Sequence, residues 1–564
     1  MPLIRTLAVA GLAVVTAAAP VTAMGVSGAY LAGRHASFEN DFRMGAEYYT
    51  RALALDPSNP ALMEAVVTAN VNLGRPDRAV PVARRMVEGD FRSQVANLVL
   101  LAEAARTEDF AGIVSSLDDG RSVGGLVDGL ARAWATMGAG DAQAALDAFD
   151  AIADEEGLAS FALYNKALAL ALVGDYEGAD DILSGREEGG LQMSMRGVLA
   201  RAQVLSQLGR NDDAMAFLDA TLGPAPSPAY AALRDRLVAG ETVPFDMIAG
   251  PAEGIGEVLY GIAEALSGET NGGYTLIYAR LAHWLNGGNV DALLLSASLL
   301  EDLDQFDLAT AAYDEVPREH PAFVSAEMGR ADALREAGKP DAAIEALTQL
   351  AEANPDLRRV HRRLGDTLRA LERHAEASEV YDRVVAMIDE PVPSDWSLYF
   401  VRGITLERTD RWEAAEADFR QSLALNPDQP QVLNYLGYSL VDMGENLDEA
   451  LDMIERAVAA RPDSGYIVDS LGWAMYRLGR YDEAITHMER AVELMPVDPI
   501  INDHLGDVYW AVGREMEARF QWRRALSFDP EPEDAERIRA KLERGLDAVL
   551  AEEGAAPLAA RDDG

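Results

Sequence analysis

The 564-residue chain contains no cysteine, and this absence excludes a whole group of functions. Without thiols there is no disulfide, no cysteine-ligated zinc, no iron–sulfur cluster, no thiol nucleophile and no lipid attached through cysteine. Lysine is also scarce, because Lys166, Lys339 and Lys541 are the only three among 49 basic residues. The absence of cysteine leaves the redox compartment open.

Positive charge is in short supply throughout the chain. Its 49 basic residues face 93 acidic ones, which gives a formal net charge of −44. Binding to nucleic acid draws most of its free energy from Lys and Arg that neutralise phosphates, so a field of this sign opposes it. Hydrophobic residues nevertheless make up 49% of the chain, enough for a large core and too many for a disordered acidic tail. The length fits three or four ordinary domains or one elongated array.

Motifs for catalysis or metal binding are also missing from the sequence. None of the seven histidines belongs to a His-Glu-x-x-His pattern, and Glu483 with His487 is a spacing that exposed helices often show. The sequence has no Gly-x-Ser-x-Gly nucleophile elbow and no phosphate loop. Gly254 and Gly256 come closest to such a loop, but no strand precedes them and no Lys follows. We therefore expect a protein that is not an enzyme and has no metal and no cofactor.

The one long apolar run lies at the N-terminus. Residues 1–5 carry one positive charge, residues 6–19 are uncharged and apolar, and Val21-Thr22-Ala23 ends in the small residues typical of a cleavage site. This layout predicts a signal peptide cleaved after Ala23 and an exported, periplasmic protein. An uncleaved N-terminal membrane anchor is the alternative, because no further charge appears before Arg34. No later segment has the roughly 20 apolar residues that a spanning helix needs.

The second half of the chain is periodic. Alanine precedes most of the repeating prolines by twelve residues, and a large apolar side chain follows that alanine after four, as with Ala484 and Met488. Leu-Gly pairs open several periods, as at Leu471-Gly472. The prolines recur every 34 to 36 residues, at Pro321, Pro355, Pro391, Pro427, Pro462, Pro496 and Pro530.

This period has a direct physical interpretation. Apolar residues three and four apart form one face of a helix, and glycine ends the first helix of each period. An acidic residue begins the second helix, where it complements the helix dipole, and proline ends it. Because one such hairpin cannot bury its own apolar face, neighbouring hairpins must stack.

The pattern resembles that of the tetratricopeptide repeat family, most closely over residues 290–530, where seven units fit. The resemblance implies an all-α fold, a right-handed α-solenoid of stacked helix-turn-helix hairpins. The expected order is a signal peptide (1–23), N-terminal repeats (24–90), degenerate hairpins (91–289), seven repeats (290–530), a capping helix (531–551) and a disordered tail (552–564). Within the degenerate part we expect helices at 251–268 and 274–286, and 223–250 fits the pattern worst.

A cluster of arginines forms the first candidate binding surface. Six Arg and two acids lie between Arg358 and His374, a positive stretch in an acidic chain. In the family the first helix of each repeat lines a concave groove, and the resemblance places Arg359, Arg362 and Arg369 on it. Arg binds carboxylates through two parallel hydrogen bonds, which suits a partner's acidic group. The alternative is that these arginines pair with acids of neighbouring repeats and keep the helix soluble.

Aromatic residues form the second candidate surface. The resemblance places Tyr438, Trp473, Tyr476 and Trp510 at groove positions of first helices, and such side chains dominate binding hot spots. The alternative is that some of them fill the space between neighbouring helices. For Trp522, at a packing position of the pattern, we expect that core role.

These observations together favour a non-catalytic scaffold or adaptor. We expect it to bind a peptide or protein partner in the concave groove, in the assembly of a bacterial cell envelope. The alternative function is binding of an envelope glycan, peptidoglycan or an exported polysaccharide, with the aromatic rings stacked on sugars. We expect no nucleic acid and no metal among the partners, and at most weak association with the membrane or an envelope complex.

Overall fold

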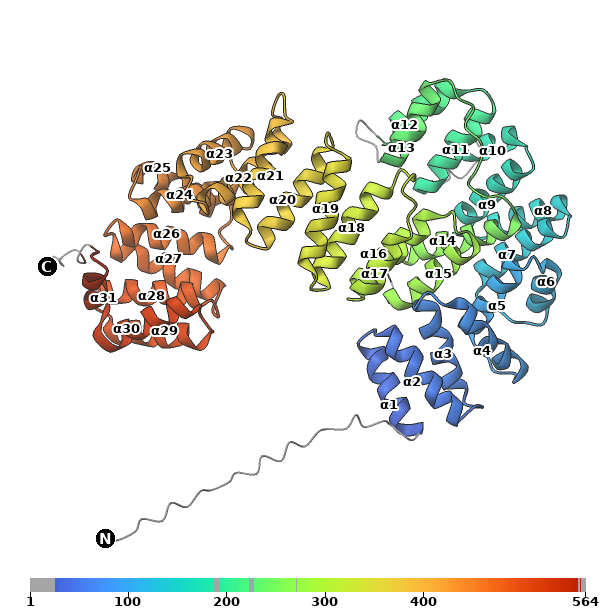
Figure 1. Ribbon diagram of the computed structural model, residues 1–564, viewed down its shortest axis with the longest axis horizontal. Coiled ribbons are helices and arrows are strands. Elements are labelled where there is room, and N and C mark those ends of the chain that lie inside the picture. The colour runs from blue at the N-terminus through green and yellow to red at the C-terminus, as the bar shows by residue number, and fades with distance from the viewer. Residues whose placement is uncertain (1–25, 186–192, 223–227, 270, 556–557, 559–564) are drawn as a thin grey trace, which may run out of the picture. The chain divides into compact units, whose positions relative to one another are not determined.

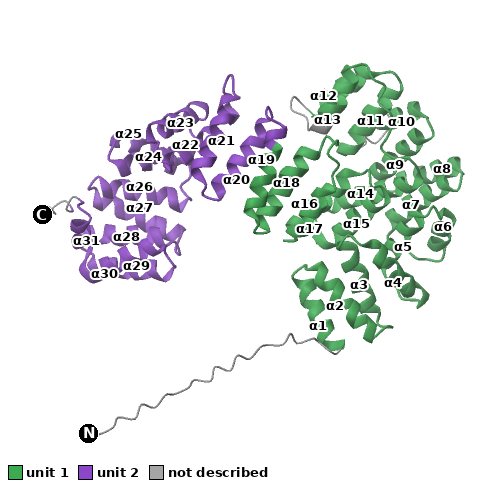
Figure 2. Cartoon of the chain, viewed as in Figure 1, with its two compact units in different colours: residues 1–350 green, residues 351–564 purple. Residues whose placement is uncertain are grey.

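A computed structural model describes residues 26–185, 193–222, 228–269, 271–555 and 558. Every regular element in these ranges is a helix, which confirms the predicted all-α class. The chain forms two compact units, residues 1–350 (unit 1) and 351–564 (unit 2), with the boundary inside helix α19 (Figure 2). The predicted signal peptide and most of the predicted tail lie outside the described residues.

Unit 1 begins with a series of helical hairpins, and its later helices include α14 and α15, which pack back on those hairpins. Its helices are α1 (Val26–Phe38), α2 (Phe42–Leu55), α3 (Pro60–Asn72), α4 (Pro76–Glu88), α5 (Gln94–Arg106), α6 (Phe110–Asp118), α7 (Gly125–Gly138), α8 (Ala142–Ala153), α9 (Ala159–Leu172), α10 (Tyr176–Leu183), α11 (Met195–Gln207), α12 (Asn211–Leu222), α13 (Pro228–Val238), α14 (Pro251–Leu266), α15 (Gly272–Leu285), α16 (Val290–Asp302), α17 (Phe306–Asp314), α18 (Phe323–Glu336) and α19 (Pro340–Ala353).

Short local signals set the ends of these helices. Before four of the second helices of hairpins, an aspartate accepts a hydrogen bond of 2.9–3.1 Å from the backbone N–H three residues later. Such a cap satisfies one of the free donors at a helix start and typically stabilises it by about 1 kcal/mol. The four capping residues are Asp41, Asp109, Asp141 and Asp175.

Helices α14 and α15 occupy the inner side of the N-terminal hairpins. Helix α14 packs on α5, α7 and α9, and α15 packs on α3 and α5 (Figure 1). The close approach of α14 to α7 requires Gly254, since a Cβ there would lie 2.6 Å from Cε3 of the fully buried Trp134. All seven residues from Gly254 to Tyr260 are buried, so this stretch of α14 is enclosed on every side. The first helices α3 to α9 are therefore covered by the chain's own helices.

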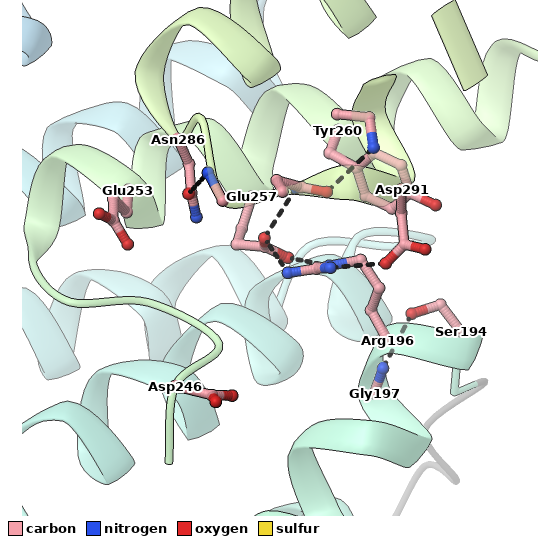
Figure 3. A network of polar contacts seen from close by, with 12 residues as sticks. Ser194, Arg196, Gly197, Asp246, Glu253, Glu257, Tyr260, Asn286 and Asp291 are labelled. Carbon is pink, nitrogen blue, oxygen red and sulfur yellow. Dashed lines mark hydrogen bonds and ion pairs between the residues drawn. The ribbon is translucent and has the colours of Figure 1, made fainter. Parts of the chain in front are cut away.

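A buried polar network fastens α14 to its neighbours (Figure 3). The Arg196 guanidinium on α11 donates to Glu257 on α14 through Nε at 2.9 Å and Nη2 at 2.5 Å, and to Asp291 on α16 at 2.7 Å. Glu257 also accepts from Tyr164 at 3.2 Å and from Asn289 at 3.1 Å. Burial raises the pKa of Glu257, and the Arg196 charge opposes that rise. The network thus places a fully satisfied ion pair in the interior of unit 1.

Unit 2 continues with hairpins of the predicted period. Its helices after α19 are α20 (Arg358–Ala370), α21 (His374–Ala386), the 3-10 turn η1 (Pro393–Asp395), α22 (Trp396–Glu407), α23 (Trp412–Leu425), α24 (Pro430–Met443), α25 (Leu447–Ala460), α26 (Gly465–Arg477), α27 (Tyr481–Leu494), α28 (Pro499–Ala511), α29 (Glu515–Ser527), α30 (Pro532–Arg544) and α31 (Leu546–Glu552).

Each of the five hairpins from α20 to α29 closes around a glycine of its first helix. A Cβ on Gly365 of α20 would lie 2.7 Å from Cε1 of Tyr381 on α21, and one on Gly403 of α22 would lie 2.6 Å from Cε1 of Phe419 on α23. The large apolar residue of the second helix therefore fills the space that the glycine leaves. Trp522 has this place on α29 and is fully buried, as its position in the pattern predicts.

Two expectations about element boundaries can be compared with the helices. The predicted helices at 251–268 and 274–286 are confirmed by α14 and α15. The expectation of one capping helix over 531–551 is wrong, because α30 and α31 are separate helices that meet at Gly545. Gly545 has a φ of 84°, a conformation that favours glycine and ends the helical path.

Candidate functional site

The first helices of successive repeats line a groove of about 570 Å³ in unit 2. It takes Tyr438 and Asp442 from α24, Tyr466 and Asp469 from α26, and Ile500 from α28. Tyr466 is 46% exposed and Ile500 38%, which are large values for apolar side chains in a concavity. We call these five residues, with the other lining residues Glu407, Arg408, Asp410, Trp412, Asn434, Tyr435, Ser439, Met443, Ser470 and His504, the unit 2 groove.

Tyr438 stands in the middle of the groove wall. Its ring is half-buried, and burial, together with Asp469 and Asp442, raises the pKa of its phenol to about 12. Nearby Tyr435 donates its hydroxyl to Glu407 at 3.1 Å. The hydroxyl of Tyr438 makes no hydrogen bond within the described part of the chain, so it remains available to a ligand.

The groove is acidic. Its lining contains Glu407, Asp410, Asp442 and Asp469 but only one arginine, Arg408. Asp442 pairs with Arg477 at 3.0 Å, an exposed contact that water screens. Glu407 lies 3.6 Å from Arg408 and Asp469 lies 3.1 Å from His504, so Asp410 and Asp442 are the lining acids best placed to attract a positively charged group.

A stacked group of rings adjoins the groove. The Trp473 ring lies 3.9 Å from that of His504, with 15° between their planes, and 4.8 Å from that of Tyr476. His504 Nδ1 lies 3.1 Å from Asp469. Burial alone would lower the pKa of His504, but Asp469 and the nearby Asp503 and Asp507 raise it above its usual value. The stacked imidazole and indole rings join α28 to α26.

Beyond this stack a buried ammonium group lies where α30 packs on the last repeat. Lys541 of α30 is fully buried, and its Nζ lies 2.7 Å from Oδ2 of Asp503 and 2.7 Å from Oδ1 of Asp507, both on α28. Burial and Asp507 raise the pKa of Asp503 to about 6, although Lys541 opposes the rise. Trp522 Nε1 donates to Asp507 at 2.9 Å. This cluster joins the C-terminal helices to the final repeat.

Comparison with known proteins agrees with this architecture. A family model described as tetratricopeptide repeat matches residues 30–93 and five overlapping stretches, 328–395, 362–430, 400–465, 435–499 and 470–532. These stretches belong to the tetratricopeptide repeat family. The unit 2 groove lies entirely within the matched repeats, whereas α14 and α15 lie outside them.

Individual relatives match only parts of this repeat protein or match it loosely. A TPR repeat-containing protein of Pseudomonas aeruginosa is 30% identical over 193 residues, which cover 34% of this chain and 32% of the relative. The match thus spans about a third of that relative's length. The solved Cut9–Hcn1 hetero-tetramer of the APC/C is similar at 14% identity, covering 92% of this chain and 96% of its own, with a TM-score of 0.37. YrrB, described as a TPR protein with an unusual peptide-binding site, is 19% identical over 35% of this chain and 98% of its own, with a TM-score of 0.28.

The predicted groove aromatics of these repeats differ in how much surface they present. Tyr438 lines the groove, and Trp473 is half-buried beside it. Tyr476 is only 7% exposed. Trp510 donates its Nε1 to Asp547 of α31 at 2.8 Å, and its ring lies 5.4 Å from that of Trp522. The C-terminal helices therefore take up part of the surface that the repeat pattern alone would leave to a partner.

The predicted arginines all lie on α20, the first helix of its repeat. Arg359 is exposed, and Arg362 donates to Ser397 at 3.0 Å. Arg369 is half-buried beside Tyr381, whose pKa it lowers against the larger effect of burial. The alternative of pairing with acids of a neighbouring repeat holds for Arg358, which lies 3.1 Å from Asp395. Arg359 is thus the most accessible of the three proposed contacts.

Sequence reasoning missed the acidic character of the groove and the buried groups around it. Asp469 and His504 lie on first helices of neighbouring repeats, and Lys541 lies on α30 after the last repeat. A pattern that records only apolar residues does not show how these groups pair. The available signal was that Lys541 is one of only three lysines in the chain. In the described ranges no set of three or more His, Asp or Glu side chains is arranged to hold a metal ion. Nor does any described helix have the length and apolarity to cross a bilayer.

Proposed function

We propose that this repeat protein is an adaptor that binds an extended segment of a partner protein in the unit 2 groove. The observation that carries the proposal is the groove of about 570 Å³ that places the unpartnered Tyr438 hydroxyl beside exposed Tyr466 and Ile500. In unit 1 the corresponding side of α3 to α9 is covered by α14 and α15. An uncovered concave surface is the place where repeat arrays commonly bind their partners.

The chemistry of the groove defines the kind of segment that it accepts. Tyr438, Tyr466 and Ile500 form an apolar wall that suits an aromatic or branched aliphatic side chain. Asp410 and Asp442 at the rim suit a lysine or arginine next to that anchor. Arg359, Arg362 and Arg369 on α20 would contact an acidic group elsewhere on the same partner. The segment is therefore apolar at its centre and basic beside it.

The first prediction concerns the anchor contact. Tyr438→Ala should weaken partner binding at least tenfold, or about 1.4 kcal/mol, because it removes an aromatic wall and a hydroxyl from a concave surface. A photo-crosslinking amino acid at position 466 identifies the bound segment by mass spectrometry, and calorimetry with the corresponding peptide then measures the affinity. Raising the salt concentration should weaken binding further through the rim acids.

Phe520 provides the matched control for this experiment. It is an aromatic residue of a second helix, α29, and is 58% exposed. Phe520→Ala should leave the affinity unchanged, and a crosslinker at position 520 should not capture the same segment. Equal losses for Tyr438→Ala and Phe520→Ala would contradict binding in the groove.

Glycan binding is the second candidate, motivated by the accessible part of Trp473. Two rings already lie nearly parallel to its indole, which reduces the flat surface left for a sugar. If a glycan were nevertheless the ligand, peptidoglycan or polysaccharide fragments at millimolar concentration would change the fluorescence of wild type but not of Trp473→Phe. We expect no such difference.

The cell envelope is the proposed place of action, and the charge and apolarity pattern of residues 1–23 supports it. We expect N-terminal sequencing of the protein from its native source to begin at Met24. A chain that still begins at Met1 would reject cleavage and favour the anchored alternative.

A further inference from the structure

A small pocket in unit 1 combines one unpaired cation with apolar walls. It has a volume of about 340 Å³ and lies between the end of α3, the start of α4, and helices α15 and α17. Its walls include Leu73, Pro76, Trp284, Leu308 and Ala312. The volume is at the small end of the range for ligand pockets.

Arg280 is the unusual residue of this pocket. In the described part of the chain it makes no ion pair or hydrogen bond, and its Nε is buried without an acceptor. A Cβ added to Gly74 would lie 3.6 Å from the guanidinium carbon of Arg280. The backbone at Gly74 therefore covers one side of the guanidinium group. Arg196, in contrast, uses three nitrogens to bind two carboxylates. Burial lowers the pKa of Arg280, because removing a charge from water is costly, and the charge of Glu315 across the pocket opposes that effect.

Two further features make the pocket favourable for a negative charge. Helix α4 begins at Pro76, which lines the pocket, and its N-cap Arg75 forms no side-chain capping hydrogen bond. The dipole at this end of α4 therefore adds positive potential. One turn from Arg280, His283 has its Nδ1 buried without a partner.

A single acid limits how much negative charge the pocket accepts. Glu315 lines its edge, with a side chain 60% exposed and 3.7 Å from His283 Nε2. A ligand with one negative charge can place it at Arg280, whereas a dianion would also meet the repulsion of Glu315. A planar carboxylate matches the two parallel donors of a guanidinium.

We propose that this pocket binds a small organic monocarboxylate, with its carboxylate on Arg280 and its hydrocarbon body against Leu308 and Ala312. Glu315 attracts Arg280 across the pocket but forms no direct ion pair with it in the described part of the chain, so the ligand would supply the direct partner and the apolar walls the remaining contact. The site is separate from the unit 2 groove, so it does not depend on the function proposed for that groove.

The proposal can be tested with 4-fluorobenzoate as the probe. Fluorine NMR of the full chain should show saturable line broadening at millimolar probe concentration, which an equal concentration of inorganic phosphate reverses only weakly. Arg280→Met should weaken binding at least tenfold. Arg78→Met should leave it unchanged, because Arg78 is an exposed arginine of α4 that does not line the pocket.

A second variant separates loss of the site from loss of the fold. Arg280→Met should melt at or above the wild-type temperature, since it removes a half-buried charge that has no direct ion-pair partner in the described part of the chain. Ala311 lines the pocket from an exposed position, so Ala311→Trp should obstruct the pocket while Arg280 stays in place. Loss of binding in both variants supports the site. Unchanged binding in either variant, or no saturable binding to wild type, overturns it.

Discussion

Arg196→Met should lower the free energy of unfolding of unit 1 by about 3–5 kcal/mol, the usual effect of removing one partner of a buried ion pair. The substitution leaves Glu257, which is 2% exposed, without the guanidinium that fills two of its acceptor positions. Glu257 must then remain charged in an apolar interior or take up a proton, and either outcome weakens the attachment of α14. Urea unfolding followed by circular dichroism measures the change.

Two controls distinguish this effect from simple loss of contact area. Arg51→Met breaks an exposed pair with Glu47, in which the side chains are 50% and 56% exposed, and should change stability by less than about 1 kcal/mol. The double substitution Arg196→Met with Glu257→Leu should recover much of the loss, because no buried charge is then left unpaired. If the double variant is no more stable than Arg196→Met, the ion pair is not the cause.

Lys541→Met should lower the free energy of unfolding of unit 2 by a similar amount, and the size of this loss should depend on pH. The change leaves the carboxylates of Asp503 and Asp507 buried together without the ammonium that lies 2.7 Å from each. We expect a loss of about 3–5 kcal/mol above neutral pH, by the same reasoning as for a broken buried pair. The helices α30 and α31 should loosen first, because Lys541 joins α30 to α28.

The direction of the pH dependence follows from the pKa of Asp503. In the folded protein this pKa is already raised to about 6, so the folded state binds a proton that the unfolded state has released between about pH 4 and 6. This carboxyl therefore favours folding less as the pH rises through that range. Removing Lys541 raises the folded pKa further, so the deficit of Lys541→Met should be largest above pH 7 and should narrow toward pH 5.

The measurement for this prediction is urea unfolding of wild type and variant at pH 5 and pH 8. Arg544→Met is a suitable control, since Arg544 lies on the same helix in an exposed pair with Glu552. Its small deficit should not depend on pH. An equally large deficit of Lys541→Met at both pH values would show that packing, and not the two carboxylates, accounts for the loss.

The hairpins were predictable because their signals are local. Gly365 and Tyr381 are sixteen positions apart in the numbering, and one repeat contains both the small residue and the side chain that fills its space. The period therefore predicts the packing of α20 to α29 without knowledge of any distant segment. The placement of Tyr438 at the inner wall follows from the same register.

The parts that the sequence did not reveal depend on residues far apart along the chain. Arg196 and Glu257 are separated by 61 positions and belong to helices without a clear repeat pattern. Likewise, the register places Trp510 on the inner face but says nothing of Asp547, which accepts its indole N–H from 37 positions away. A periodic pattern reports which face a residue occupies, whereas the neighbour that covers it is set by tertiary packing.

The enclosure of α14 also accounts for the irregular sequence between residues 91 and 289. In a simple array each helix needs only to match the next copy, which keeps every copy close to a common consensus. Helices α5, α7 and α9 must instead all match a single helix, α14. Selection on these helices therefore acts as it does in a globular core, and their substitutions should be correlated with those in α14 and not with the equivalent positions of neighbouring hairpins.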